Sequence, residues 1–277
     1  MKLARLSDGT RSFWALQGAA GKTVCEIAGS IRDWAPAVTR GGGEAALPLV
    51  GEARPLGGLT FLAPVERGNR VVVAGANYRK HLAEFGVGET SQPIAFLKSY
   101  GALIGAHDPI RYPPLTEKLD HEVELVAVIG IADIDLDNPF DAILGYTVGN
   151  DISARDLQRS GPVGIGMDLF AGKSQDKSTP MGPWVVTRDE FPAGQPAFRL
   201  HLTVNGETRQ DANTDQMTWD VGELIKFVQQ RSSFEPGDVM FTGSPDGVGD
   251  STGRYLFSGD RIITTVEGVG TLDNTVA

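Results

Sequence analysis

Alternating or uninterrupted apolar stretches recur along the chain and predict a mainly β protein. Side chains in a strand alternate between its two faces, so short runs of this kind favour strands over helices. We expect strands over Lys2–Leu6, Arg11–Leu16, Val71–Ala74, Glu122–Ile129, Ala142–Val148, Trp184–Thr187, Arg199–Asn205 and Glu207–Gln210. The dipeptide Asn205-Gly206 between the last two strands is typical of a tight hairpin turn.

Helical spacing of apolar residues is less frequent. We expect helical segments over Thr23–Val38, Lys80–Phe85, Ser153–Gln158 and Trp219–Ser232. In the third of these, Ser153 followed by Asp156 fits the pattern of a capping box. In the last, apolar residues recur at intervals of three and four. The segment Gly41–Gly58 is rich in Gly, Pro and Ala and is expected to be an irregular connector.

The strong strand signals begin after Pro64, which indicates where the chain divides. We expect a small N-terminal domain at residues 1–66 and a larger domain at residues 67–277. A chain of 277 residues can bury a large core, and its 35 glycines and 16 prolines favour tight turns between short strands. The predicted fold class is α+β, mainly β.

Composition limits the partners of the protein. A formal charge of −10 argues against nucleic acid, because phosphate binding requires a basic face. The one cysteine, Cys25, cannot form an internal disulfide, which favours a reducing compartment. No signal-peptide core and no stretch long enough to cross a bilayer are found. We therefore expect a soluble, cytoplasmic protein with no membrane partner.

Two carboxylates interrupt a strand that is otherwise apolar on both faces. Glu122 and Glu124 are two residues apart, so they point the same way, and Val126 and Val128 continue their face. Like charges ~4 Å apart repel by about 4 kcal/mol at an effective dielectric of ~20. Either one carboxylate is protonated or a cation lies between them. The alternative is that the strand begins at a solvent-exposed end and both glutamates are hydrated.

A third carboxylate follows the next strand. Asp151 lies where that strand runs into the segment opened by Ser153, and it could complete a site of oxygen ligands that suits Mg, Mn or Ca. Alternatively, Asp151 is a local cap or turn residue. His121 points to the face opposite the two glutamates, and no second histidine has zinc-site spacing, so we interpret it as structural.

A histidine and a glutamate could form a general-base pair. On a helix His81 and Glu84 share a face, so the carboxylate could orient the imidazole and raise its basicity. The same spacing also arises by chance on exposed helices. Lys173 lies in a Gly-Lys-Ser sequence that lacks the rest of a phosphate loop. The turn Thr242–Gly249 could pack against a ligand or could simply connect two elements.

The order of these features resembles the fumarylacetoacetate hydrolase superfamily. The resemblance covers about residues 71–274 and rests on an ordered set of motifs: Gly75–Tyr78 with His81 and Glu84, Phe96–Lys98, Leu119–Leu125, Gly145–Val148, Asn150–Asp151, Ser153–Gln158, Gly172–Ser174, Met181–Trp184, Val204–Glu207, Glu235–Val239, Thr242–Gly249 and Gly268–Leu272. Each motif is weak alone, but the ordered set is specific.

The resemblance implies a fold and a metal. Members have a mixed β-roll that carries the active site, many have a small N-terminal domain before it, and the usual assembly is a homodimer. Glu122, Glu124 and Asp151 match the family's divalent-metal ligands, so Mg or Mn is the implied cofactor.

The resemblance also implies roles for five other residues. Lys173 matches the lysine that contacts a substrate oxygen, and Gln158 matches a polar residue near the substrate. His81 and Glu84 match the dyad that activates water, carried on a lid that often orders only with ligand. Ser244 is a looser match to a hydroxyl residue near the substrate carboxylate.

These residue types favour an enzyme that acts on a small anionic 2-oxo acid. The hypothesis is a hydrolase of 2,4-dioxo acids, of the acylpyruvate or fumarylacetoacetate type, in the catabolism of aromatic or sugar acids. A metal and Lys173 would stabilise the pyruvate enolate that leaves. Alternatives are β-decarboxylation of oxaloacetate, and isomerisation or hydration of an unsaturated 2-hydroxy acid. A metal-dependent protein that only binds a small acid is the non-enzymatic alternative.

The segment after Gln158 departs from the family pattern, so the substrate tail cannot be inferred from the core motifs. Within it, Met167 and Phe170 could line an apolar tail pocket or could pack the loop. We expect packing.

Overall fold

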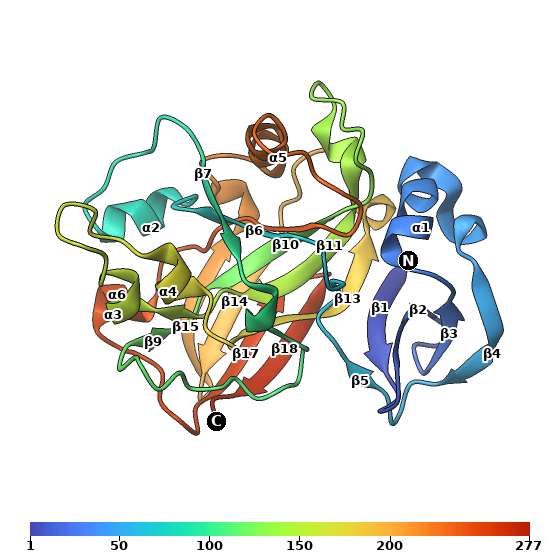
Figure 1. Cartoon of the computed structure of the whole chain (residues 1–277), viewed down its shortest axis with the longest axis horizontal. Helices are drawn as coiled ribbons and strands as arrows, with labels where there is room; N and C mark the ends of the chain where they lie inside the picture. The colour runs from blue at the N-terminus through green and yellow to red at the C-terminus, as the bar shows by residue number, and fades with distance from the viewer.

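The computed structural model describes residues 1–277 and contains one large mixed sheet (Figure 1). Its strands are β1 (Lys2–Ser7), β2 (Ser12–Gln17), β3 (Thr23–Ile27), β4 (Leu49–Pro55), β5 (Thr60–Phe61), β6 (Val71–Gly75), β7 (Ile94–Lys98), β8 (Leu103–Ile104), β10 (Val123–Ile129), β11 (Ile143–Asn150), β13 (Thr179–Thr187) and β16 (Val239–Phe241). The order along the sheet is β4-β3-β2-β1-β13-β11-β10-β16-β6-β7, with β5 paired to β1 and β8 to β13. Pairing is antiparallel except for β16 with β6 and β13 with β8.

Two smaller sheets complete the β structure. A four-stranded sheet has the order β15-β14-β17-β18, formed by β14 (Arg199–Val204), β15 (Glu207–Asn213), β17 (Arg261–Val266) and β18 (Gly270–Thr275). A two-stranded sheet pairs β9 (Leu119–Asp120) with β12 (Ser153–Ala154). The predicted hairpin turn is confirmed, because Asn205 and Gly206 both have positive φ between β14 and β15.

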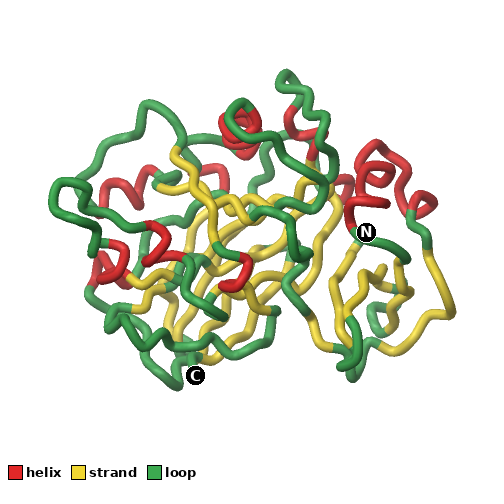
Figure 2. Tube along the Cα trace, viewed as in Figure 1, coloured by secondary structure: helices red, strands yellow, loops and turns green.

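The helices are short and lie around the strands (Figure 2). They are α1 (Ile31–Ala37), α2 (Arg79–Glu84), α3 (Arg155–Gln158), α4 (Leu169–Lys173), α5 (Val221–Gln229) and α6 (Gly249–Thr252). Helices α2, α3, α4 and α6 gather at the end of the molecule opposite the N-terminal strands (Figure 1). The predicted α+β, mainly β fold class is confirmed. No helix combines the length and the apolar character that crossing a membrane requires.

Strand β10 is buried on both faces, as its two-sided apolar pattern predicts. On one face, Leu125 and Ala127 belong to a core of 42 residues that also contains side chains of the four-stranded sheet. On the other face, Val126 and Val128 belong to a core of 20 residues that includes Trp14 from the N-terminal strands. Packed side chains therefore cover the middle of the large sheet on both faces and fix the position of β10.

The N-terminal segment is joined to the rest of the chain through the large sheet. Strand β1 pairs antiparallel with β13, with Leu3 opposite Val185. The segment nevertheless forms a separate lobe around β1 to β5 and α1 (Figure 1). The boundary expected between residues 1–66 and 67–277 stays a prediction.

Three local predictions are wrong. The first part of Thr23–Val38 is strand β3, and a helix begins only at Ile31. The segment Gly41–Gly58 contains β4, whose side chains are almost all exposed because it is the last strand of the sheet and pairs only with β3. Its sequence therefore lacks the alternation that identifies half-buried strands.

The third error concerns Ser153, which does not cap a helix. It lies in β12, opposite Asp120, and α3 begins two residues later at Arg155. The hydroxyl of Ser153 donates to the carbonyl oxygen of Asp151 at 2.9 Å, and Asp156 accepts from the backbone N–H of Glu117 at 2.8 Å. Pairing with a distant strand has replaced the local cap.

Candidate active site

The three predicted metal ligands come together at the adjoining ends of β10 and β11. These strands are antiparallel, with Val123 opposite Asn150. Glu122, just before Val123, and Asp151, just after Asn150, therefore lie next to each other at the end of the strand pair. One oxygen from each of Glu122, Glu124 and Asp151 lies within 4.8 Å of the others. The three residues are buried, with exposed fractions of 6%, 0% and 0%. Hydrated glutamates at a solvent-exposed strand end are therefore wrong. Asp151 as a local cap or turn residue is wrong as well, because its side chain contacts the distant Lys173 and Lys98.

Backbone contacts fix these two strand ends. The side-chain oxygen of Asn150 accepts from the N–H of Glu122 at 2.9 Å, and the N–H of Asp151 donates to the carbonyl oxygen of Glu122 at 2.8 Å. The Oε2 atom of Glu124 accepts from the N–H of Gly243 at 2.7 Å. The backbones of Glu122 and Asp151 are thus joined to each other, and the carboxylate of Glu124 is held by the main chain of a segment distant in sequence.

Lys173 lies directly against this acidic cluster. Its ammonium donates to Glu122 Oε2 at 2.7 Å and to Asp151 Oδ2 at 2.6 Å. Burial disfavours the charge on Lys173, but Asp151 and Glu122 outweigh burial and raise its pKa above the ordinary value. Lys173 is therefore a cation, placed where it would meet the oxygens of a bound anion.

Two further cations at the cluster, Lys98 and Arg155, were not assigned a role from the sequence. The ammonium of Lys98, at the end of β7, contacts Asp151 Oδ1. Arg155 contacts Glu122 at 2.6 Å and Asp120 at 2.8 Å. Both lie in motifs that carry the family resemblance, and a charged residue that ends an otherwise apolar strand, as Lys98 does, is a usable signal.

The electrostatics of the cluster fit a divalent cation. Burial raises the pKa of Glu122, but Lys173 and Arg155 outweigh it and lower the value to about 2. Burial, together with the charges of Asp151 and Glu122, raises the pKa of Glu124 well above its usual range. Glu124 Oε1 is also buried without any hydrogen-bond partner. An unpartnered carboxylate oxygen among other carboxylates is the environment in which a hard cation such as Mg²⁺ or Mn²⁺ binds.

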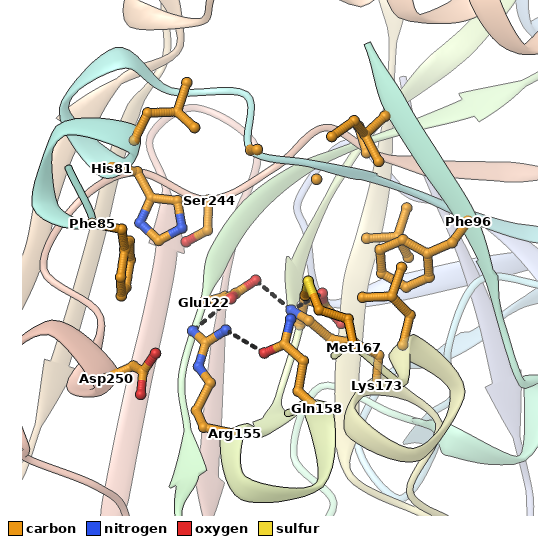
Figure 3. Close-up of a pocket in the computed structure, with 18 of the residues that line it drawn as sticks. His81, Phe85, Phe96, Glu122, Arg155, Gln158, Met167, Lys173, Ser244 and Asp250 are labelled. Carbon is orange, nitrogen blue, oxygen red and sulfur yellow. Dashed lines mark hydrogen bonds and ion pairs between the residues drawn. The ribbon is translucent and has the colours of Figure 1, made fainter. Parts of the chain in front are cut away.

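A cavity of about 620 Å³ opens above the cluster (Figure 3). Its lining includes most of the residues selected from the sequence, namely His81, Glu122, Asp151, Gln158, Lys173 and Ser244. Glu84 and Glu124 do not line it, but each contacts a segment that does. The structure therefore brings residues from α2, from the segments flanking β10 and β11, from α3 and α4, and from the turn after β16 to one concavity.

His81 and Glu84 form a pair at the wall of this cavity. The distance between His81 Nδ1 and Glu84 Oε2 is 3.3 Å, and Glu84 Oε1 accepts from the N–H of Gly247 at 2.9 Å and from the hydroxyl of Ser251 at 3.0 Å. Burial raises the pKa of Glu84, but these hydrogen bonds outweigh it and lower the pKa. An ionised Glu84 accepts a hydrogen bond from Nδ1–H of His81, which leaves the lone pair of His81 Nε2 free to act as a base. The two side chains meet as their shared helix face predicts, and the role of the pair as a general base stays a prediction.

The side-chain oxygens of Gln158 and Ser244 each accept one hydrogen bond from a neighbouring side chain. Gln158 Oε1 accepts from Arg155 at 3.2 Å, and Ser244 Oγ accepts from the amide of Gln210 at 2.9 Å. The hydroxyl proton of Ser244 is therefore available to an acceptor in the cavity. His121 lies outside the cavity against Gln210, with 3.4 Å between His121 Nδ1 and Gln210 Oε1, which fits its interpretation as structural.

The expectation that Met167 and Phe170 pack the loop is wrong. Met167 lines the cavity and is 53% exposed, and Phe170 is 73% exposed. Met167 lies in the loop between α3 and α4, whereas Phe170 lies in the first turn of α4 with its side chain largely in solvent.

Comparison with known proteins gives the same family as the motifs. The family model of the C-terminal domain of fumarylacetoacetate (FAA) hydrolase matches residues 70–277. The mitochondrial oxaloacetate tautomerase FAHD2A of Bos taurus is 37% identical over 245 residues, which cover 84% of this chain and 77% of that protein.

Two solved structures extend the similarity to the fold. A 5-carboxymethyl-2-hydroxymuconate delta-isomerase from Mycobacterium smegmatis has a TM-score of 0.82 and 32% identity, covering 100% of this chain and 99% of the other. A fumarylpyruvate hydrolase from Pseudomonas aeruginosa, in complex with Mn²⁺ and pyruvate, has a TM-score of 0.68 and 31% identity, covering 82% and 92%. With the matched family model and the shared fold, this chain belongs to the fumarylacetoacetate hydrolase family.

Proposed function

We propose that the protein is a divalent-metal-dependent hydrolase that cleaves a C–C bond in a 2,4-dioxo acid of the acylpyruvate type. The observation that carries this proposal is that His81, with Nε2 free, lines the same cavity as Lys173 and the carboxylate cluster. The similarity to a fumarylpyruvate hydrolase in complex with Mn²⁺ and pyruvate supports it.

Glu122, Glu124 and Asp151 would hold the metal, Mg²⁺ or Mn²⁺, which when bound supplies a Lewis acid for the charge that develops on a 2-oxo acid. Three carboxylates exceed the charge of one divalent cation, so an anionic substrate requires another positive group. Lys173 lies against two of these carboxylates and would hold a substrate oxygen beside them.

His81 would act as the general base. Nε2 takes a proton from a water molecule while the water oxygen bonds to the 4-carbonyl carbon, and Glu84 stabilises the resulting imidazolium through Nδ1. The bond between C3 and C4 then breaks, and its electron pair passes to the pyruvate enolate. The acyl carbon leaves as a carboxylic acid, and protonation of C3 gives pyruvate. One water is consumed in each turnover.

A second candidate is keto–enol tautomerisation of oxaloacetate, which the similarity to the Bos taurus tautomerase favours. This reaction moves a proton between C3 and an oxygen and requires no attacking water. The similarity to a delta-isomerase supports proton transfer of the same kind on an unsaturated acid. His81 is again the candidate base, so product analysis must separate these reactions.

The test is a comparison of products with Mg²⁺, with Mn²⁺ and with EDTA. For an acylpyruvate, we expect metal-dependent release of pyruvate together with the matching carboxylic acid. His81→Ala should lower turnover by about 10²- to 10⁴-fold and leave metal binding unchanged. His107→Ala, at an exposed histidine outside the cavity, is the matched control and should keep full turnover.

Other results of the same test would support one of the alternative functions. Interconversion of oxaloacetate tautomers without hydrolysis of any acylpyruvate would replace the hydrolase by the tautomerase. Release of CO₂ and pyruvate from oxaloacetate would indicate the decarboxylase. Binding of these acids without any metal-dependent turnover would leave a small-acid-binding protein and reject the enzymatic proposal.

A further inference from the structure

The cavity has an apolar part that the proposed chemistry does not use. The carboxyl and carbonyl groups of a 2,4-dioxo acid would lie near Lys173 and His81. Much of the remaining lining is apolar, formed by Leu82, Phe85, Val87, Ile94, Phe96 and Met167. Phe85 lies beside His81, whereas Phe96 and Met167 lie on the Lys173 side (Figure 3). A substrate tail that extends past His81 or past Lys173 would therefore meet apolar side chains.

These apolar side chains are exposed to water to an uncommon degree. The exposed fractions are 40% for Phe85, 52% for Val87, 46% for Ile94 and 53% for Met167. Exposed apolar residues are ordinary when they are scattered, but these four surround a single concavity. Covering them with an apolar group would be favourable in proportion to the area removed from water.

The cations of the cavity are already paired with protein carboxylates. The pairs are Lys173 with Glu122 and Asp151, Arg155 with Asp120 and Glu122, and Arg159 with Asp250. A metal held by the cluster would compete with Lys173 for its carboxylates and would release one ammonium group. One released cation can receive one substrate carboxylate. A second carboxylate, at the far end of a substrate, would find no unpaired cation and would lose hydration beside apolar side chains.

We propose that the substrate carries an uncharged, apolar tail, an alkyl or aryl group on its 4-carbonyl, and that Met167 is a specificity-determining residue for this tail. The inference rests on the proposed action on 2-oxo acids and adds the class of tail. It predicts that monocarboxylic substrates are preferred over substrates whose tail ends in a second carboxylate.

The test measures equilibrium binding of 2-oxo acids that lack the 4-carbonyl group and so cannot be hydrolysed. Isothermal titration calorimetry in Mg²⁺ or Mn²⁺ would compare 2-oxobutanoate, 2-oxohexanoate and 2-oxooctanoate with the diacid 2-oxooctanedioate. We expect Kd to fall about fourfold for each methylene that becomes buried. The diacid should bind about tenfold or more weakly than the monoacid of equal length.

A pair of loop variants locates the effect. Met167→Lys places a cation in the cavity wall, so it should remove the gain with chain length and improve binding of the diacid. Val163→Lys, on the same loop but outside the lining, is the matched control and should keep the wild-type order. If Met167→Lys does not fold, the chain-length series with the wild-type protein still decides the inference.

The outcomes separate this inference from the proposed function. Equal or tighter binding of the diacid would overturn the apolar tail and would indicate that Arg159 leaves Asp250 for the ligand. Absence of a gain with chain length would also overturn it. A gain with chain length but no hydrolysis of any 2,4-dioxo acid would keep the tail and reject the hydrolase. Absence of binding by every one of these acids would reject both.

Discussion

At the scale of single residues, the cavity floor is a balance of buried charges. Glu122 and Asp151 face Lys173, Lys98 and Arg155 at contact distance, and all five side chains are almost fully buried. Removing one partner from a buried pair is costly because the remaining charge is left without compensation. The lysines therefore have a structural effect whenever no metal is bound, in addition to any role with substrate.

Lys173→Met tests this balance. Without the ammonium, the buried carboxylates repel one another, so the free energy of unfolding in EDTA should fall by about 3–5 kcal/mol. The same change removes a cation that competes for the oxygens of Glu122 and Asp151, so Mg²⁺ or Mn²⁺ should bind more tightly. Thermal or chemical unfolding in EDTA and calorimetric titration with the metal measure the two effects.

The control for this variant is Lys2→Met, which removes an exposed lysine from a strand and should change neither quantity. Equal unfolding free energies of Lys173→Met and the wild type in EDTA would contradict the balance. Weaker metal binding by Lys173→Met would contradict the competition between the ammonium and the metal.

The sequence allowed the carboxylates to be predicted more easily than their partners. Glu122 and Glu124 interrupt an apolar strand, which is a local pattern, and Asp151 follows the next strand along the chain. The contacts of Lys98 and Arg155 join segments that are distant in sequence. The spacing of apolar and polar residues along the chain does not indicate which distant side chains will pair. Only the spatial arrangement reveals that these charges meet.

At the scale of elements, the predictions succeeded where burial imposes a period. The sequence predicted the apolar face of α5 and the two buried faces of β10, because most positions that face a core carry apolar side chains at a regular interval. The predictions failed for β3, β4 and Ser153. These elements depend on pairing with a neighbouring strand and not on their own pattern.

The turn after β16 is the element that positions Glu124. Gly243 has φ +93°, its N–H is the one hydrogen-bond donor to Glu124, and a Cβ there would lie 2.8 Å from Asn77 Cβ. Asn77 cannot yield, because its amide donates to the carbonyl oxygens of Thr242 at 2.8 Å and Trp219 at 3.0 Å. The turn therefore requires glycine at this position.

Gly243→Ala should lower the free energy of unfolding by about 2–4 kcal/mol, from backbone strain and the close contact together. It should also weaken metal binding, because Glu124 loses the donor that orients it. Denaturant unfolding and calorimetric metal titration measure these effects. Gly253→Ala is the matched control: φ is +72° but no atom lies within 4 Å, so it should cost about 1 kcal/mol and leave metal binding unchanged.

At the scale of the whole molecule, the location and the assembly of the protein stay predictions. The expected cytoplasmic location is untested, and a similar tautomerase is mitochondrial. The expected homodimer is likewise a proposal from the family resemblance, which sedimentation velocity would test.

The arrangement of the two cores bears on the predicted boundary at residue 66. The core of 20 residues combines Trp14 and Trp34 with Val126 and Val128, which lie on the same side of β10 as Glu122 and Glu124. The N-terminal lobe therefore covers the sheet face that carries Glu124, although it contributes no residue to the cavity. The family model matches residues 70–277 and therefore does not include the N-terminal residues that pack against this face of the sheet.

A chain of residues 67–277 should therefore be less stable than the whole protein and should bind metal more weakly, even though it contains every predicted site residue. Its exposed β13 edge and the uncovered Val126 and Val128 would favour aggregation. Circular dichroism, unfolding curves and metal titration would compare it with the full chain. Trp34→Ala, which leaves β1 paired, should show a partial effect of about 3–5 kcal/mol. A monomeric 67–277 chain with unchanged metal affinity would show instead that the two units fold independently, as the sequence division predicts.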